Sequence, residues 1–153
     1  QIVHDQKLEV LDQLIEEANG QPVLVFYNYK HELDRLQARY PQAIHVKEEN
    51  VVKRWNAKEI PILLANPASA GHGLNLQFGG HIAIWYSPTW NLEFFQQANK
   101  RLHRRGQAET VLIHTLMAKG TIDERIYDIV LRNKEAGQNA LLEAVKARIK
   151  EVT

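Results

Sequence analysis

The chain has 153 residues, which is enough for one domain built around a single hydrophobic core. Its 19 Lys and Arg against 18 Asp and Glu give a net charge of +1, which excludes a uniformly basic nucleic-acid-binding protein, so any contact with nucleic acid must come from a local patch. It contains no Cys, which excludes disulfides and Cys-based metal sites, and it has no apolar run near the ~20 residues that cross a bilayer.

The first half of the chain alternates between helical and strand patterns. Leu8, Leu11 and Leu14 recur at helical spacing, and Gly20 and Pro22 end that helix. A buried strand, a helix, a short strand, a helix and another buried strand are predicted in that order at residues 22–27, 30–40, 43–46, 48–58 and 60–65.

The second half continues this alternation. Strands are predicted at residues 81–86 and 110–116, with a helix at residues 91–104 between them. A long helix is predicted from Thr121 towards the end of the chain, interrupted or kinked near Gly137.

Continuous apolar strands that alternate with helices predict an α/β fold of three layers, a parallel sheet with helices on both faces. Residues 1–133 are expected to form the main lobe, and residues 134–153 a C-terminal helical extension. In parallel sheets, ligands bind beyond the carboxyl ends of the strands. Functional residues are therefore expected in the segments that follow the strands.

The glycine-rich segment, residues 66–76, directly follows the strand at residues 60–65. Its sequence is NPASAGHGLNL, in which small residues and two glycines let the backbone approach another molecule and present its N–H groups. By itself the segment favours a tight connection between a strand and a helix, with ligand binding as the alternative.

The arginine segment, residues 96–107, has the sequence QQANKRLHRRGQ. On a helix, Arg101 and Arg104 would project from one face, with Gln97 one turn before Arg101. Two guanidinium groups on one face suit phosphate oxygens and can stabilise the charge that develops in phosphoryl transfer. A solvated basic helix face is the alternative, and the segment alone favours neither.

In order and separation, the two segments resemble motifs V and VI of superfamily-two helicase-like ATPases, and most closely the phage and bacterial members of the Swi/Snf-type branch. Residues 22–27 resemble motif IV, residues 85–91 the family's aromatic-proline-Trp-Asn stretch, and residues 119–124 its Gly-Thr-Ile-Asp/Glu-Glu stretch. The resemblance covers residues 4–130 and implies the C-terminal RecA-like lobe of such an enzyme. Trp90, at the entrance of a predicted helix, is expected to pack in the core, with a place at the DNA side of the cleft as the alternative.

The resemblance implies catalytic roles in the arginine segment. Arg101 and Arg104 would contact the γ-phosphate of ATP as arginine fingers and stabilise its transfer. Gln97 would orient a finger or the attacking water, with a plain surface amide as the alternative.

The resemblance also assigns binding roles in the glycine-rich segment. Gly71, Gly73 and Asn75 would approach the nucleotide, with turn geometry as the alternative. Asn66 and Ser69 would contact DNA phosphates.

Two parts of a complete ATP site do not occur in the sequence, namely a P-loop and an Asp-Glu-x-His box. In the family these belong to the N-terminal RecA-like lobe, expected on the same polypeptide. ATP with Mg²⁺ would lie between the lobes, and the Mg²⁺ ligands would come from that other lobe, so no metal site is expected here. The chain alone is expected to be inactive as an ATPase.

The favoured function is therefore the C-terminal lobe of an ATP-dependent DNA helicase or translocase that acts on duplex DNA. One alternative is a non-catalytic nucleic-acid-binding or protein-docking module derived from such a lobe, and another is an unrelated doubly wound nucleotide-binding protein. Residues 134–153 would pack on this lobe or brace the other. The chain is expected to be a monomer without a membrane partner, in the cytoplasm of a bacterium or of a phage-infected host.

Overall fold

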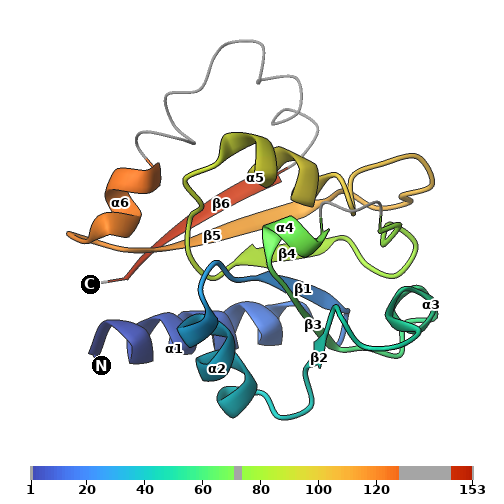
Figure 1. The fold of residues 1–153 in the computed structure, drawn as a ribbon, viewed down its shortest axis with the longest axis horizontal. Coiled ribbons are helices and arrows are strands. Elements are labelled where there is room, and N and C mark those ends of the chain that lie inside the picture. Colours follow the sequence, from blue (N-terminus) through green and yellow to red (C-terminus); the bar gives the residue numbers. More distant parts are fainter. Residues whose placement is uncertain (1, 71–73, 128–145, 153) are drawn as a thin grey trace.

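The computed structural model describes residues 2–70, 74–127 and 146–152, which form one sheet of six parallel strands (Figure 1). The strand order is β2-β3-β1-β4-β5-β6. The strands are β1 (Val23–Phe26), β2 (Ile44–His45), β3 (Ile62–Ala65), β4 (Ile82–Trp85), β5 (Leu112–Ala118) and β6 (Lys146–Val152). The helices are α1 (Ile2–Glu17), α2 (Lys30–Arg39), α3 (Val51–Asn56), α4 (Pro67–Ala70), α5 (Leu92–Asn99) and α6 (Ile122–Ile126).

The two faces of the sheet carry separate hydrophobic clusters. Successive side chains of a strand point to opposite faces. In β1, Val23 and Val25 therefore belong to one cluster, and Leu24 and Phe26 to the other. All four are fully buried, because an all-parallel sheet is covered on both sides.

Helices α1 and α2 cover the first face (Figure 1). Leu8, Leu11 and Leu14 are buried on one side of α1, as their helical spacing predicts. Leu36 of α2 is fully buried in the same cluster. The chain leaves α2 at Tyr40, whose N–H donates to the carbonyl oxygen of Leu36 at 2.8 Å.

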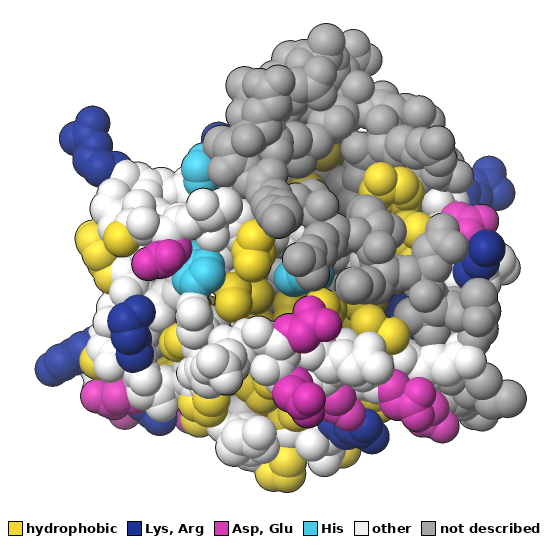
Figure 2. Space-filling model, turned by 180° about the vertical axis from the view of Figure 1, so that it is seen from behind, with side chains coloured by type: hydrophobic (Ala, Val, Ile, Leu, Met, Phe, Trp, Pro, Cys, Tyr) yellow, Lys and Arg dark blue, Asp and Glu magenta, His cyan; other side chains and the backbone are white. Residues whose placement is uncertain are grey.

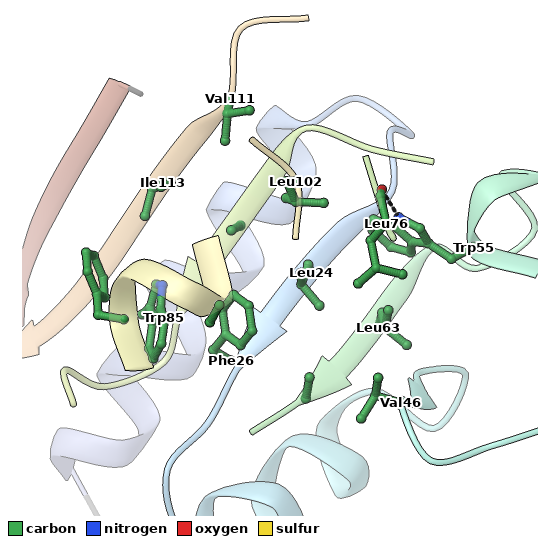
Figure 3. Close-up of a cluster of buried hydrophobic side chains, with 14 of the residues drawn as sticks. Leu24, Phe26, Val46, Trp55, Leu63, Leu76, Trp85, Leu102, Val111 and Ile113 are labelled. Carbon is green, nitrogen blue, oxygen red and sulfur yellow. Dashed lines mark hydrogen bonds between the residues drawn. The ribbon is translucent and has the colours of Figure 1, made fainter. Parts of the chain in front are cut away.

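Two tryptophans anchor the second face, which α3 and α5 cover (Figure 3). Trp85 is fully buried at the end of β4, stacks on Phe26 with ring centroids 4.4 Å apart, and donates through Nε1 to Asn99 Oδ1 at 2.9 Å. Trp55 of α3 is fully buried and donates through Nε1 to the carbonyl oxygen of Leu76 at 2.8 Å. Both indole N–H groups thus have partners inside the core.

Charged side chains of both signs are interspersed over the coloured part of the face shown in Figure 2. This distribution agrees with the net charge of +1. A buried ion pair joins Lys7 of α1 to Asp123 of α6, and Lys7 also donates to the carbonyl oxygen of Tyr86 at 3.2 Å. Among the helices of the described residues, none has the length and apolarity needed to cross a membrane.

The predicted three-layer α/β fold is confirmed, and the five predicted strands correspond to β1 to β5. Each of these strands begins and ends within two residues of its predicted boundaries.

The helix predicted towards the end of the chain is wrong for its last part, because residues 146–152 form β6 beside β5. In the sequence, Ala147 and Ile149 alternate with Lys146, Arg148 and Lys150, a period of two that suits a strand. Residues 128–145, including Gly137, lie outside the described residues. The division at residue 133 and the bracing role of residues 134–153 remain predictions.

Candidate functional site

The glycine-rich segment and the residues that follow it, up to Gly80, lie beside the arginine segment and are joined to it by hydrogen bonds. The N–H of Leu76 donates to the carbonyl oxygen of Arg101 at 3.2 Å. The side chain of Gln77 donates to the carbonyl oxygen of Arg105 at 3.1 Å, and that of Gln107 to the carbonyl oxygen of Gly80 at 2.9 Å. Two stretches about 25 residues apart therefore form one folded unit.

The prediction that Arg101 and Arg104 lie on a helix is wrong, since α5 ends at Asn99. Tight turns follow, in which the N–H of Arg101 donates to the carbonyl oxygen of Ala98 at 3.1 Å and that of Leu102 to Asn99 at 3.2 Å. The buried Asn99 side chain meanwhile accepts the indole N–H of Trp85. These contacts fix the point at which the chain leaves the helix.

The two guanidinium groups nevertheless converge. Nη1 of Arg101 and Nη1 of Arg104 reach the carbonyl oxygen of Leu74 at 3.4 and 3.5 Å. Nε of Arg101 also donates to the main-chain carbonyl of Gln97 at 3.2 Å, so Gln97 holds Arg101 in place through its backbone. The structure thus brings together the three residues predicted to be catalytic.

The electrostatics of this pair suit an anion. Burial lowers the pKa of Arg101, and the neighbouring charge of Arg104 lowers this pKa further. Within the described residues, neither guanidinium forms an ion pair with an acidic side chain. Two adjacent positive charges without a carboxylate partner form a fork that matches phosphate oxygens. Within the same residues, no group of three or more His, Asp and Glu side chains is placed to hold a metal ion.

Helix α3 holds the end of the glycine-rich segment from the other side, a role that the sequence did not reveal. Besides the bond from Trp55 to Leu76, Nδ2 of Asn56 donates to the carbonyl oxygen of Asn75 at 2.8 Å. Nζ of Lys58 donates to the carbonyl oxygen of Gly79 at 3.2 Å. The side chain of Asn75 is exposed. Its predicted neighbours at the nucleotide, Gly71 and Gly73, lie outside the described residues.

Two glycines allow this close approach of α3. A Cβ atom on Gly79 would lie 2.2 Å from the carbonyl oxygen of Trp55, and one on Gly80 would lie 2.8 Å from the Trp55 ring. Side chains at these positions would therefore push this part of the chain, just after the glycine-rich segment, away from α3. The consecutive glycines before β4 are the sequence signal that could have indicated this contact.

Asn66 and Ser69, the residues predicted to contact DNA, lie just before and within α4, a helix that the sequence did not predict. Oδ1 of Asn66 accepts the N–H of Ser69 at 2.7 Å and so caps this short helix. The hydroxyl of Tyr27, the residue after β1, lies 2.7 Å from His45 Nε2. Both predicted residues are partly exposed.

A pocket of about 340 Å³ opens beside Asn66, beyond the carboxyl ends of β1, β3 and β4. It is lined by Asn28, Tyr29, Asn66, Pro67, Ala68, Thr89, Trp90, Asn91 and Phe94. The expectation that Trp90 packs in the core is wrong, because Trp90 is 46% exposed and lines this pocket. The sequence showed a tryptophan at a helix entrance but not the neighbours that leave it open.

The chain is similar to known proteins in sequence and in fold. Residues 6–106 match the model of the helicase conserved C-terminal domain. The putative protein p41 of Acyrthosiphon pisum secondary endosymbiont phage 1 is 41% identical over 95% of this chain and 33% of its own length. The chromatin-remodeling ATPase INO80 of Mycosarcoma maydis is 32% identical over 99% of this chain.

The chain spans 33% of the phage protein and only 9% of that INO80 protein, so it covers a third or less of the length of either relative. Among solved structures, the C-terminal part of the Fun30 ATPase domain superposes with a TM-score of 0.74 at 26% identity. That likeness covers 85% of this chain and 46% of the other.

Proposed function

Since the chain belongs to the helicase conserved C-terminal domain family, as the C-terminal RecA-like lobe of a Swi/Snf-type helicase-like ATPase, we propose that it supplies the arginine fingers of an ATP-driven motor on DNA. Arg101 and Arg104 are the fingers, and Gln97 positions Arg101. The observation that carries this proposal is the convergence of both guanidinium groups on Leu74 without an acidic partner among the described residues.

The nucleotide of the proposed motor is ATP with Mg²⁺. The paired guanidinium groups fit its terminal phosphates, whose developing charge they would stabilise during transfer. Asn75, with Gly71 and Gly73, would line the nucleotide on this side. The sequence contains neither a P-loop nor an Asp-Glu-x-His box, so we assign the phosphate-cradling lysine and the Mg²⁺ ligands to the N-terminal RecA-like lobe of the same polypeptide.

The DNA surface of the proposed motor lies around α4. Asn66 and Ser69 sit beyond the carboxyl end of β3, where parallel sheets place their ligands. Asn66 fixes the first turn of α4, so the Ser69 hydroxyl of this turn keeps a defined position towards a phosphate backbone. The partner we propose is duplex DNA, along which the two-lobe enzyme would move.

The experiment that tests this function compares the full-length protein with the 153-residue chain. We expect the full-length protein to hydrolyse ATP with Mg²⁺ and to do so faster with duplex DNA, and the isolated chain to show no turnover. Turnover by the isolated chain would overturn the half-site proposal. A full-length protein that binds DNA without ATP hydrolysis would instead identify a non-catalytic nucleic-acid-binding module.

A further inference from the structure

Three exposed aromatic rings surround the pocket beside Asn66. The exposed fractions are 47% for Tyr29, 46% for Trp90 and 39% for Phe94, in contrast with Trp55 and Trp85, which are fully buried. Tyr29 also stacks in parallel on His31, with ring centroids 5.4 Å apart. Large aromatic rings at the mouth of a pocket are surfaces on which a flat molecule can stack.

The polar side chains of the pocket are held by bonds to neighbouring groups. Nδ2 of Asn28 donates to Ser87 Oγ at 2.9 Å and to the carbonyl oxygen of Pro88 at 3.0 Å. Oδ1 of Asn91 accepts the N–H of Phe94 at 3.0 Å at the start of α5. These bonds leave the carbonyl oxygen of Asn28 and the amino group of Asn91 for other partners. The lining therefore includes one side chain with a free acceptor and one with a free donor beside the aromatic rings.

We propose that this pocket binds an unpaired nucleobase of the DNA on which the motor acts, an inference that rests on the proposed function. Every nucleobase has a flat face for stacking and an edge of donors and acceptors. A volume of about 340 Å³ lies at the small end of the range for ligand pockets, which suits one base. Placement beside Asn66 brings the pocket next to the proposed contact with the DNA backbone.

Other occupants fit the lining less well. The lining residues include no Lys or Arg to bind a phosphate and no Asp or Glu to bind a cation. An apolar side chain from a protein partner would fill the pocket without using the free amide ends of Asn28 and Asn91. A base satisfies both the rings and the amides. The enzyme would thus sense a base that has left the double helix.

The test compares two DNA duplexes that differ only in one extra, unpaired base in one strand. Binding of each to the full-length protein is measured by fluorescence anisotropy. We expect tighter binding of the bulged duplex, and we expect Trp90→Ala to weaken that binding by roughly tenfold, the typical effect of one lost stacking partner. Trp90→Phe, which keeps a ring, should retain most of the preference, and Phe94→Ala should reduce it. Binding of the fully paired duplex should change little in all three variants.

The matched control is Phe78→Ala, because Phe78 is 56% exposed but packs beside Gly106, outside the pocket. It should keep the preference for the bulged duplex. Equal binding of both duplexes by the wild type, or equal losses on both in Trp90→Ala, would overturn the proposal. An unchanged preference for the bulged duplex in Trp90→Ala would also overturn it.

The proposed function fails separately from this inference. If the full-length protein binds paired duplex DNA and hydrolyses ATP but shows no preference for the unpaired base, only the pocket assignment is wrong. If it neither binds paired duplex nor hydrolyses ATP, the proposed function itself is wrong.

Discussion

Arg101 and Arg104 share one acceptor, since the Nη1 atoms of both reach the main-chain carbonyl oxygen of Leu74, at 3.4 and 3.5 Å. Leu74 belongs to the glycine-rich segment, which follows β3, and the two arginines follow α5. The fingers are therefore positioned by the segment that also lies beside the proposed DNA surface. A shift of Leu74 would move both guanidinium groups together.

The first prediction concerns the fingers. In the full-length protein, Arg101→Ala and Arg104→Ala should each lower DNA-stimulated ATP turnover by about 10³-fold or more, because stabilisation of the transferred phosphoryl group is lost. Lysine at either position should not restore turnover, because an ammonium group lacks the planar fork of a guanidinium. Steady-state phosphate release measures the effect. Arg105→Ala is the neighbouring control, and near-normal turnover in either finger variant would contradict the assignment.

The second prediction concerns the contact between α3 and the glycine-rich segment. Asn56→Ala removes the donor that holds the carbonyl oxygen of Asn75. Loss of this hydrogen bond should lower the free energy of unfolding by only about 1 kcal/mol. We expect kcat to fall more than this loss of stability explains, because the position of the segment affects the fingers. Lys53→Ala, on an exposed site of the same helix, is the control for kcat and Tm. Unchanged kcat in Asn56→Ala would show that α3 does not position the site.

The third prediction uses the two glycines against Trp55. Gly79→Ala and Gly80→Ala should each destabilise the fold by roughly 1–3 kcal/mol, because the added methyl group overlaps α3. At Gly80 the nearest atom belongs to the Trp55 ring, whereas at Gly79 it is the Trp55 carbonyl oxygen. Combining each variant with Trp55→Phe should therefore relieve the loss of stability caused by Gly80→Ala but not that caused by Gly79→Ala. Denaturant unfolding of both double-mutant cycles measures the difference, and equal coupling at the two positions would contradict the packing described.

The fourth prediction is a pH dependence from His45. Burial lowers the pKa of His45 below its ordinary value of 6.5, and the charge of Lys47 lowers it further, while Glu48 opposes both. Because the folded-state pKa lies below the unfolded-state pKa, the contribution of His45 to stability is complete above about pH 6.5 and is lost as the pH falls through the folded-state value.

The measurement is the free energy of unfolding between about pH 7.5 and pH 5. His45→Gln should reduce the decline of stability over this range, whereas the exposed control His31→Gln should keep it. The same decline in wild type and His45→Gln would contradict the prediction. His45 also bonds to the hydroxyl of Tyr27, the residue after β1, so the variant should be checked for DNA binding.

The strands could be predicted from the sequence because both faces of a parallel sheet are covered. Residues such as those of β1 and β3 are buried in unbroken runs, so the runs stand out between polar helices. The end of α5 could not be predicted, because its length depends on the bond between Asn99 and Trp85, two residues brought together only by folding. The arginines converge all the same, through turns instead of a helical face.

The role of α3 left no sequence pattern for a different reason. Trp55 and Asn56 bond to main-chain carbonyl oxygens, and every residue has one, so the identity of the acceptor residues carries no signal. The strand β6 was missed because Ile149 and its neighbours also fit a helical pattern when read together with the residues before them. Which pattern applies is decided by the pairing with β5.

The bonds that hold the glycine-rich segment have an evolutionary consequence. Trp55, Asn56, Arg101 and Arg104 all donate to main-chain oxygens of residues 74–76, so these bonds do not depend on the exposed side chain of Asn75, whereas the side chain of Leu76 is fixed by its burial in the core. The side chain at position 75 can thus change without displacing the fingers. Such a lobe can adapt to new substrates by point mutation on one side of the contact, provided that the four donors persist on the other.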